Sequence, residues 1–595
     1  MSEDPFAHLH DERYADGFAA GRVGAQAMVA MGGRKRIPLA GAWRITPDLY
    51  DEGLRQQWYL CAADDPSGWT RPRDYDEGGA EAVPVPSCWN LLKPEWKHFE
   101  GSMWYARAFT WPPMMHGERL ALRVGAANYE ARVFLNGRFV GAHRGGSTPF
   151  FADLTPALRA GANALMIQVE NRRRADRVPM HHTDWFNYGG LYREVDLLVL
   201  PPTFIRRAEA ALVPDGTLSR IRVSIGLSAP AAGMAEVEIP ALGLAAAVPI
   251  EGGRGEAMLA ARPEPWSVAT PRLYDVVFRF GADRVQDRIG FREIRADGER
   301  LVLNGRKLTL RGISVHEDDA ERGKCTDEAD LRRRFAHVRE LGANFLRLAH
   351  SPHHERVAEI ADAEGVLLWS EIPVYWAIDF ANPETYADAE NQLLELIGRD
   401  ANRASVIAWG VGNENADTDA RYRFMAALAE AARRADATRL VGAACLINRG
   451  EFAIADRLAA HLDLIGLNEY FGWYEPDFAG LERLLANSHP GKPVLISETG
   501  ADALAGHRGG IHELFTEDCQ AEIYRRQLEI VGRAAFVQGF CPWLLYDFRT
   551  ERRQNRFQHG WNRKGLIAED KVTKKLAFEV LARHYHAGGR RNDAG

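Results

Sequence analysis

The sequence predicts two β-sandwiches followed by a (β/α)8 barrel, and two observations support this prediction. Between residue 37 and about residue 290 the chain shows short strands and turn signals, with no helical period in 37–200. Beyond residue 296, eight continuous apolar strands alternate with helical stretches. Alternating strands fit sheets with one solvated face, whereas continuous apolar strands are buried on both faces. With 595 residues, the chain is long enough for three such domains.

The first two domains are read from their strand patterns. Residues 1–36 form an N-terminal extension of unknown role, with a small, apolar FAAGRVGAQAMVAMGG run that suits a loose helix or a packing arm. In residues 37–200, RLALRV and ARVFL alternate apolar and polar residues, and ARVFL leads into Asn136-Gly137, a two-residue hairpin signal. Residues 201–295 continue with IRVSIGL and LYDVVFRF, enough for one smaller sandwich.

The barrel is predicted over residues 296–595. Its first helix contains DLRRRFAHVREL, with Leu331, Phe335, Val338 and Leu341 on one face and Gly342 at the C-cap. The eight candidate strands are LTLRGISVH, NFLRLAH, VLLWSE, SVIAWGVGNE, LVGAACL, LIGLNEY, PVLISE and FVQGFCPWLLYDF. In such a barrel the chemistry lies at the C-terminal ends of the strands.

Composition and charge argue against several classes of protein. A net charge of -7 leaves no basic face, so nucleic acid is not expected as a partner. No apolar run approaches the roughly 20 residues of a membrane span. The acidic start MSEDPFAHLHDERYADG lacks the features of a secretory signal. Six cysteines without CxxC spacing speak against a disulfide framework and a zinc site. We therefore expect a cytoplasmic protein with no membrane partner.

Carboxylates and other polar groups gather at the predicted strand ends. They are His316, Glu317, Asp318, His350, Glu371, Asn413, Glu414, Asn468, Glu469, Tyr470 and Glu498. Glu414 closes WGVGNE, whose glycines allow close backbone approach, and Glu498 closes PVLISE. A glycosidase needs one such pair, a general acid and an ionised carboxylate. If the two carboxyl groups are ~5–5.5 Å apart, the reaction passes through a covalent glycosyl-enzyme and the product keeps the anomeric configuration of the substrate.

Two other interpretations stay open on spacing alone. In the first, the acids have no catalytic role, because a barrel rim always carries acids and many of them form ion pairs with arginines. The HSPHH run at 350–354 places three histidines together, as a metal site does, although it follows a strand and lacks the helical HExxH spacing. The sequence shows no GxSxG elbow, Walker loop or complete GxGxxG motif. We expect no metal and no cofactor.

Four long motifs follow one another along the chain. They are FLNGRFVGAHRGGSTPFFADLT, GFREIRADGERLVLNGRKLTLRGISVHEDD, GANFLRLAHSPHHERVAEIADAEGVLLWSEIP and SVIAWGVGNE. Together they resemble glycoside hydrolase family 2, over roughly residues 37–585. The resemblance implies a jelly roll, an immunoglobulin-like sandwich and a catalytic TIM barrel that hydrolyses a small-molecule or oligosaccharide β-glycoside with retention. Many relatives assemble, so a homo-oligomer is compatible with the resemblance.

The resemblance also implies roles for single residues. Glu414 matches the general acid/base and Glu498 the nucleophile. Asn413 would bond the sugar 2-hydroxyl, a contact that tightens in the transition state. Tyr470 matches a tyrosine that contacts the nucleophile, and Trp543 an aromatic floor under the sugar's apolar face.

Three further residues lie in family motifs. Asp184, in DWFNYGG, matches an aspartate that reaches from the first domain into the barrel pocket in the β-glucuronidase branch. His350 is a candidate substrate-binding residue. For His350 and Glu371, however, a role in buttressing the rim through hydrogen bonds is favoured.

The stretch HGWNRKGLIAED bears on the choice of sugar. Asn562 and Lys564 match an Asn-x-Lys motif that holds the sugar's C6 carboxylate in the β-glucuronidase branch. A carboxylate that leaves water for a cleft needs a cation and hydrogen-bond donors. The alternative is a solvated turn before a last helix that begins near Val572.

The resemblance thus implies a retaining exo-β-glucuronidase that cleaves terminal β-D-glucuronosides. The Arg-rich run LLYDFRTERRQNRFQHG departs from the branch, and its Arg549, Arg552 and Arg553 could recognise a second acid or a different epimer. A β-galacturonidase, a neutral-sugar β-galactosidase and an inactive carbohydrate-binding protein therefore stay open as alternatives.

Overall fold

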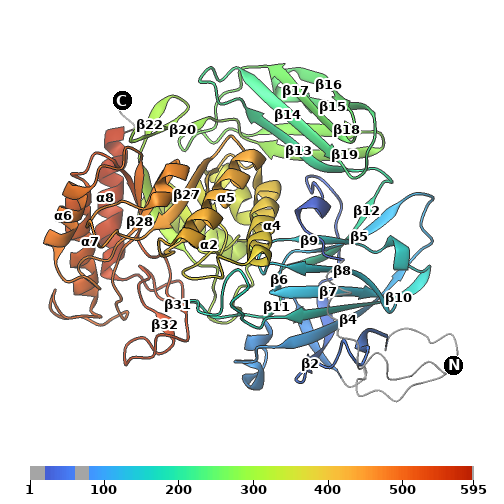
Figure 1. Ribbon diagram of the computed structural model, residues 1–595, viewed down its shortest axis with the longest axis horizontal. Helices are drawn as coiled ribbons and strands as arrows, with labels where there is room; N and C mark the ends of the chain where they lie inside the picture. The colour runs from blue at the N-terminus through green and yellow to red at the C-terminus, as the bar shows by residue number, and fades with distance from the viewer. Residues whose placement is uncertain (1–20, 61–79, 593–595) are drawn as a thin grey trace.

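The computed structural model of the protein describes residues 21–60 and 80–592. It contains two β-sandwiches and a closed barrel of eight parallel strands, which confirms the predicted fold class (Figure 1). The colour runs from a blue first sandwich through a green second sandwich to a yellow and red barrel. Most of the predicted N-terminal extension and Cys61 lie outside the described residues.

The first sandwich has two main antiparallel sheets. Its strands are β1 (Ile37–Pro38), β2 (Gly41–Asp48), β3 (Glu81–Val85), β4 (Ser102–Trp111), β5 (Arg119–Val124), β6 (Ala127–Asn128), β7 (Glu130–Leu135), β8 (Arg138–Arg144), β9 (Phe150–Asp153), β10 (Gly161–Glu170), β11 (Gly190–Leu191) and β12 (Val195–Leu200). One sheet has the order β3-β2-β4-β10-β7-β8 and the other β1-β12-β5-β9. Leu122 and Ile167, one from each sheet, share one buried cluster.

The predicted hairpin connects β7 and β8. Leu135 pairs with Arg138, so Asn136 and Gly137 form a two-residue turn. Both turn residues have positive φ, 51° and 77°. Such a turn follows the twist of the two strands, which explains the Asn-Gly sequence.

The second sandwich has seven strands in two antiparallel sheets. They are β13 (Ile205–Leu212), β14 (Arg220–Leu227), β15 (Gly233–Ile239), β16 (Leu244–Ile250), β17 (Arg254–Ala260), β18 (Tyr274–Phe280) and β19 (Asp283–Ile289). The sheet orders are β13-β14-β17 and β16-β15-β18-β19. Val223 and Phe278 meet in the core between them. The immunoglobulin-like assignment stays a prediction.

The barrel follows a small sheet of β20 (Ile294–Asp297), β21 (Arg300–Leu303) and β22 (Arg306–Leu308). Its strands are β23 (Leu310–Val315), β24 (Phe345–Leu348), β25 (Leu367–Glu371), β26 (Val406–Asn413), β27 (Leu440–Cys445), β28 (Leu464–Asn468), β29 (Val494–Glu498) and β30 (Val537–Phe540). All eight fall within the predicted apolar runs, and β23 pairs with β30 to close the ring. A small hairpin of β31 (Phe548–Arg549) and β32 (Trp561–Asn562) follows.

Helices surround the barrel strands. They are α2 (Glu328–Leu341), α3 (Glu355–Glu364), α4 (Pro383–Asp400), α5 (Asp419–Ala435), α6 (Phe478–Asn487), α7 (Glu517–Val531) and α8 (Leu576–Asn592). Gly342 caps α2 with a φ of 75°, as the sequence predicts. The last helix begins at Leu576 and not near Val572, so that prediction is wrong. The Asp570 carboxylate accepts the N–H groups of Val572 and Thr573 and folds this segment into a turn.

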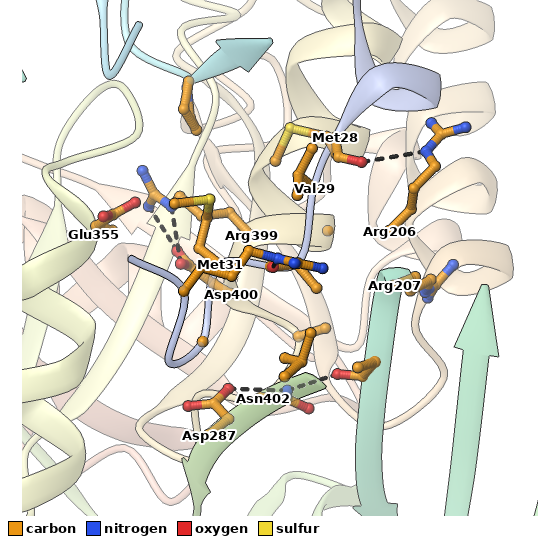
Figure 2. A pocket seen from close by; sticks show the side chains of 18 of the residues that line it. Met28, Val29, Met31, Arg206, Arg207, Asp287, Glu355, Arg399, Asp400 and Asn402 are labelled. Carbon is orange, nitrogen blue, oxygen red and sulfur yellow. Dashed lines mark hydrogen bonds and ion pairs between the residues drawn. The ribbon is translucent and has the colours of Figure 1, made fainter. Parts of the chain in front are cut away.

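Residues 21–36 run across the junction of the three domains. Val29 packs in a cluster with Phe151 of the first sandwich and Phe204 at the start of the second. The N–H of Ala25 donates to Asn391 Oδ1 in α4 at 2.9 Å. Figure 2 shows this segment beside a cavity of about 260 Å³ where the domains meet. This part of the chain packs as an arm.

Two sequence-based expectations concern membranes and cysteines. In residues 21–60 and 80–592, no helix is long and apolar enough to cross a membrane. The five cysteines of the same residues are free thiols. Cys88 and Cys325, 237 positions apart in the sequence, nevertheless bring their sulfur atoms to 3.9 Å.

Trp266 joins the second sandwich to the N-terminal end of the barrel. Its fully buried ring shares a cluster with Leu310, Phe345 and Leu440 near the starts of barrel strands. Its indole N–H donates to the backbone carbonyl of Asp362 at 2.8 Å.

Replacing Trp266 tests how strongly this contact supports the barrel. We expect Trp266→Ala to lower the free energy of unfolding by about 3–5 kcal/mol, because the change leaves a large cavity. Trp266→Phe should cost less, and Val572→Ala, at a side chain that is 70% exposed, should cost almost nothing. Urea unfolding followed by circular dichroism measures all three, and equal costs for Trp266→Ala and Val572→Ala would contradict the assignment.

Candidate active site

A cavity of about 450 Å³ opens at the C-terminal ends of the barrel strands. Eight of the nine predicted site residues line it: Asp184, His350, Glu414, Tyr470, Glu498, Trp543, Asn562 and Lys564. The ninth, Asn413, is buried directly before Glu414 in the chain. Residues up to 380 positions apart therefore share one site, as the barrel topology predicts.

Glu414 is held by two neutral donors. It follows β26 with a positive φ of 53°, which turns its backbone away from the strand direction. Trp376 donates its indole N–H to Glu414 Oε2 at 2.8 Å, and Asn468 donates its amide to Oε1 at 3.0 Å. In the described residues no basic side chain forms an ion pair with Glu414.

Glu498 has a more charged environment. Arg347 donates to Glu498 Oε1 at 2.8 Å, and the Tyr470 hydroxyl donates to Oε2 at 2.8 Å. Burial and the neighbouring Glu414 charge raise the pKa of Glu498 above its ordinary value, and Arg347 acts in the opposite direction. Glu414 and Glu498 both line the cavity, so the two carboxyl groups face one cleft.

Arg347 connects three barrel strands, β25, β26 and β29. Its guanidinium is fully buried and binds Glu371 through two N–H groups at 3.0 and 3.1 Å. It also donates to Asn413 Oδ1 at 2.6 Å. Arg347 was not predicted from the sequence. An arginine inside the apolar strand FLRL was nevertheless an available signal, because buried charges are rare unless paired.

Asn413 keeps one donor free. Its Oδ1 accepts from Arg347 and, at 3.2 Å, from Asn468. Its buried amide nitrogen has no hydrogen-bond partner among the described residues. A buried amide N–H without a partner is costly, so it is available to a ligand oxygen.

His350 and Trp543 form the aromatic side of the cleft. Their rings stack at a centroid distance of 4.9 Å and an interplanar angle of 19°. His350 Nδ1 lies 2.7 Å from Glu371 Oε1, so the histidine both lines the cleft and is buttressed by the rim. Glu371 itself is buried beneath the cleft, held by Arg347.

The three histidines of HSPHH take different partners. His350 faces Glu371, His353 contacts the carbonyl of Ala349 at 3.0 Å, and His354 Nε2 lies 3.1 Å from Glu194 of the first domain. The imidazoles therefore diverge, which favours structural roles over shared metal ligation.

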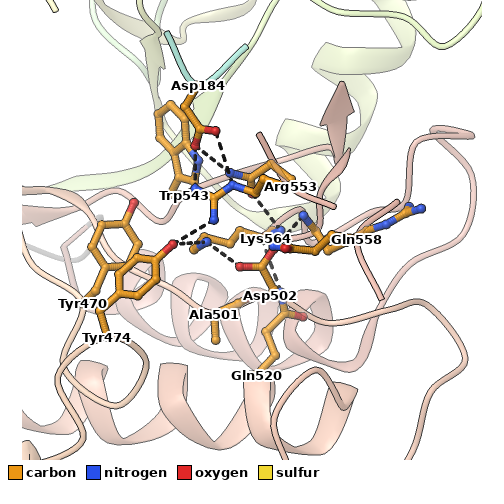
Figure 3. Close-up of polar contacts among 12 residues, drawn as sticks. Asp184, Tyr470, Tyr474, Ala501, Asp502, Gln520, Trp543, Arg553, Gln558 and Lys564 are labelled. Carbon is orange, nitrogen blue, oxygen red and sulfur yellow. Dashed lines mark hydrogen bonds and ion pairs between the residues drawn. The ribbon is translucent and has the colours of Figure 1, made fainter. Parts of the chain in front are cut away.

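Asp184 crosses from the first sandwich into the barrel cleft. Its carboxylate forms an ion pair with Arg553 at 2.5 Å (Figure 3). It also accepts the Thr550 hydroxyl at 3.0 Å. The amide of Asn562 donates to Asp184 Oδ2 at 3.4 Å. The Asp184 charge raises the pKa of Arg553 even though burial opposes it. One edge of the site is therefore built by two domains.

Lys564 is buried and already paired. Its ammonium binds Asp502 Oδ2 at 2.5 Å and donates to the Tyr474 hydroxyl at 3.0 Å (Figure 3). Burial opposes ionisation of Asp502, but the charges of Lys564 and Arg553, together with the hydrogen bonds from Lys564 and Gln558, lower the pKa of that carboxyl. An ammonium has three N–H bonds, and these contacts use two. Asp502 was not predicted, and its nearness to Glu498 in SETGAD was the only signal in the sequence.

The three arginines of the Arg-rich run have different places. Arg549 points away from the cleft, donating to the Tyr188 hydroxyl at 3.2 Å and to the carbonyl of Ala320 at 2.8 Å. Arg552 and Arg553 both line the cleft. Of the three, only these two can contact a ligand directly.

Family models agree with this architecture. A model of the glycosyl hydrolases family 2 sugar binding domain matches residues 37–201, and one of the family 2 TIM barrel domain matches residues 294–587. The chain belongs to glycoside hydrolase family 2. The hydrolase is 29% identical over 599 residues to a β-glucuronidase of Paenibacillus borealis, with 92% of this chain and 96% of that protein covered.

Solved structures of related enzymes share the whole fold of this chain. The hydrolase superimposes on an uncultured Clostridium sp. β-glucuronidase with a TM-score of 0.81 and 26% identity, covering 93% of this chain and 98% of that one. It superimposes on a GH2 β-galacturonidase of Eisenbergiella tayi with a TM-score of 0.80 and 26% identity, covering 93% and 96%. Both relatives match nearly full length.

The residues that end β28 alternate between cleft and barrel wall. Asn468 and Tyr470 contact the two catalytic-strand glutamates, whereas Glu469 points outward and accepts from Gln527 of α7 at 3.0 Å. Successive side chains of a strand point to opposite sides, which explains the division. Burial raises the pKa of Glu469 to about 7.

This raised pKa predicts a pH-dependent stability. Glu469 titrates near pH 4.5 when exposed and near 7 in the folded hydrolase, so its protonated form stabilises the fold fully below about pH 4.5. That contribution, about 3 kcal/mol, is lost as the pH rises through 7. In urea unfolding at pH 5 and pH 8, Glu469→Gln should lose less stability over this range than the wild type. An identical loss in both proteins would refute the prediction.

Proposed function

We propose that the hydrolase is a retaining exo-β-glucuronidase that cleaves terminal β-D-glucuronosides. The observation that carries the proposal is that Asn562 and Lys564 line the same cleft as Glu414 and Glu498. A pair of glutamates suits cleavage of a glycosidic bond, and a buried cation beside an amide suits a sugar with a carboxylate. The similarity to the Paenibacillus borealis and Clostridium β-glucuronidases supports the same choice.

The different surroundings of the two glutamates support their proposed roles. Glu498 contacts the Arg347 guanidinium, which favours the ionised carboxylate that a nucleophile needs. Glu414 contacts the neutral donors Trp376 and Asn468. Without a cationic partner it can take up and release a proton during turnover, as an acid/base must.

The reaction then proceeds in two displacements. Glu498 attacks the anomeric carbon while Glu414 gives its proton to the glycosidic oxygen, so the bond to the leaving group breaks and a glycosyl-enzyme forms. In the second step Glu414 takes a proton from water, which attacks the anomeric carbon and releases Glu498. The Tyr470 hydroxyl, which donates to Glu498, helps to hold the departing carboxylate in place.

The remaining residues position the sugar. Trp543 offers an aromatic face to the apolar side of the ring. The free amide of Asn413 is placed to donate to the 2-hydroxyl, where a hydrogen bond strengthens in the transition state. The third N–H of Lys564 and the amide of Asn562 bind the C6 carboxylate, and Asp184 orients that amide.

One other substrate is favoured by a specific observation. The Eisenbergiella tayi β-galacturonidase covers this chain as fully as the β-glucuronidase structures do. A galacturonide keeps the C6 carboxylate and differs only at C4, so the contacts of Asn562 and Lys564 suit both sugars.

The free thiols of the described residues also support a reducing, cytoplasmic setting.

The sugar specificity is tested with 4-nitrophenyl β-glycosides and a Lys564→Met variant. We expect the β-glucuronide to have the highest kcat/KM among the glucuronide, galacturonide, glucoside and galactoside. Lys564→Met should lower kcat/KM for the uronide about 100-fold, as loss of a buried ionic partner does.

The double variant Lys564→Met/Asp502→Asn checks that the loss is not caused by the unpaired Asp502. Preferred turnover of the galacturonide would replace the lead proposal with a β-galacturonidase. Preferred turnover of the galactoside would replace it with a neutral-sugar enzyme, and no turnover of any glycoside would indicate a binding protein.

The catalytic roles are tested separately. Glu498→Gln should reduce kcat on every substrate by at least about 10⁴-fold, because no covalent intermediate forms. Glu414→Ala should lose activity mainly on glycosides with poor leaving groups, and added azide should restore part of the activity on 4-nitrophenyl substrates and yield a β-glycosyl azide. If azide gives no product, the acid/base assignment to Glu414 is wrong.

A further inference from the structure

Most charged side chains that face the cleft form ion pairs within the protein. In the part of the chain that the structure describes, one acidic and one basic side chain do not. The ion pairs are Arg553 with Asp184, Lys564 with Asp502 and Arg347 with Glu498. The two charged lining residues left are Glu414 and Arg552. No carboxylate or hydrogen-bond acceptor of the described residues contacts the Arg552 guanidinium. Since Glu414 must be protonated to act as an acid, Arg552 is the uncompensated charge of the site.

Arg552 lies on the same side of the cleft as Glu414. Its guanidinium carbon stacks over the Trp376 ring, 4.5 Å from the centroid. The N–H of that ring donates to Glu414 Oε2 at 2.8 Å. Trp376 is itself fixed, because its backbone N–H donates to the carbonyl of Asn413 at 2.9 Å. One tryptophan thus positions both the proposed proton donor and the unpaired cation.

Position relative to Glu414 decides which part of a substrate Arg552 meets. A general acid protonates the glycosidic oxygen, so groups beside it face the leaving group and not the sugar. Lys564 and Asn562, which we propose for the sugar carboxylate, form a separate cluster with Asp502, Tyr474 and Asp184. The cleft therefore has cationic groups on both sides of the bond that is cut.

We propose that Arg552, positioned by Trp376, forms a leaving-group subsite that selects glycosides whose aglycone carries an anionic group. This inference rests on the proposed function. Trp376 holds the guanidinium in place, and its ring also stacks on Tyr375 at a centroid distance of 4.5 Å. The stacked guanidinium keeps its N–H edge free for a carboxylate or sulfate, which it binds in a bidentate manner. The shared chemistry of the ligand is a leaving group with one negative charge.

The test compares a neutral and an anionic leaving group on the same sugar. The probes are the β-glucuronides of 4-methylumbelliferone and of 3-carboxyumbelliferone, and the quantity is the ratio of their kcat/KM values. In the wild type we expect the anionic substrate to be favoured. In Arg552→Gln the ratio should fall about fivefold, the effect of one partly solvated charged contact. Arg552→Lys should keep part of the preference for the anionic substrate, and added salt should reduce this preference in the wild type.

A matched control separates this effect from a change in net charge. Arg556 is also exposed and stacked on an aromatic ring, Phe557 at 4.8 Å, but it does not line the cleft. Arg556→Gln should leave the ratio unchanged. Because the two kcat/KM values are compared within each protein, a variant that loses activity equally on both substrates keeps the same ratio.

Two results would overturn the inference. One is an equal ratio in the wild type and Arg552→Gln, including the case in which both substrates weaken together because Arg552 binds the sugar carboxylate. The other is the same fall in Arg556→Gln. If glucuronides are not cleaved at all, the proposed function fails, and the ratio is measured on the galacturonides of the same two coumarins, which still decides the role of Arg552.

Discussion

The site depends on the buried guanidinium of Arg347. It binds Glu371, Glu498 and Asn413, which come from three different barrel strands. A buried cation is tolerated only when it is fully paired, and the fixed fork of an arginine sets the directions of its partners. The carboxylate of Glu498 and the amide of Asn413 are thereby oriented before any substrate arrives. Catalysis by positioned groups requires such preorganisation.

The cations of two further ion pairs line the cleft. Lys564 with Asp502 and Arg553 with Asp184 place two cations against the cleft, and each is neutralised by an acid of the protein. Neutralisation limits the cost of burying these charges, while the remaining N–H groups stay available to a ligand. Because Asp184 comes from the first sandwich, that domain also lines the cleft and does more than support the barrel.

Much of the fold follows from local pattern. The eight apolar runs became the barrel strands, and the Asn136-Gly137 turn and the Gly342 cap formed where their backbone preferences predict. The start of the last helix was missed, because a side-chain turn at Asp570 overrides helix propensity there. For the site, eight predicted residues lie around one cavity. Arg347 and Asp502 were missed, since their partners lie far away in the sequence.

The sequence by itself determined the order of the domains, the strands of the barrel and the glutamates at its strand ends, because period, turn chemistry and long motifs are local properties of a chain. Only the tertiary structure decided which charges neutralise one another. Lys564 meets Asp502, Arg553 meets Asp184, Arg549 turns away and Arg552 is left on Trp376 beside Glu414. The physical reason is that the electrostatic energy of a charge depends on its distance to other charges and on burial, and both are set by the folding of three domains around one cleft.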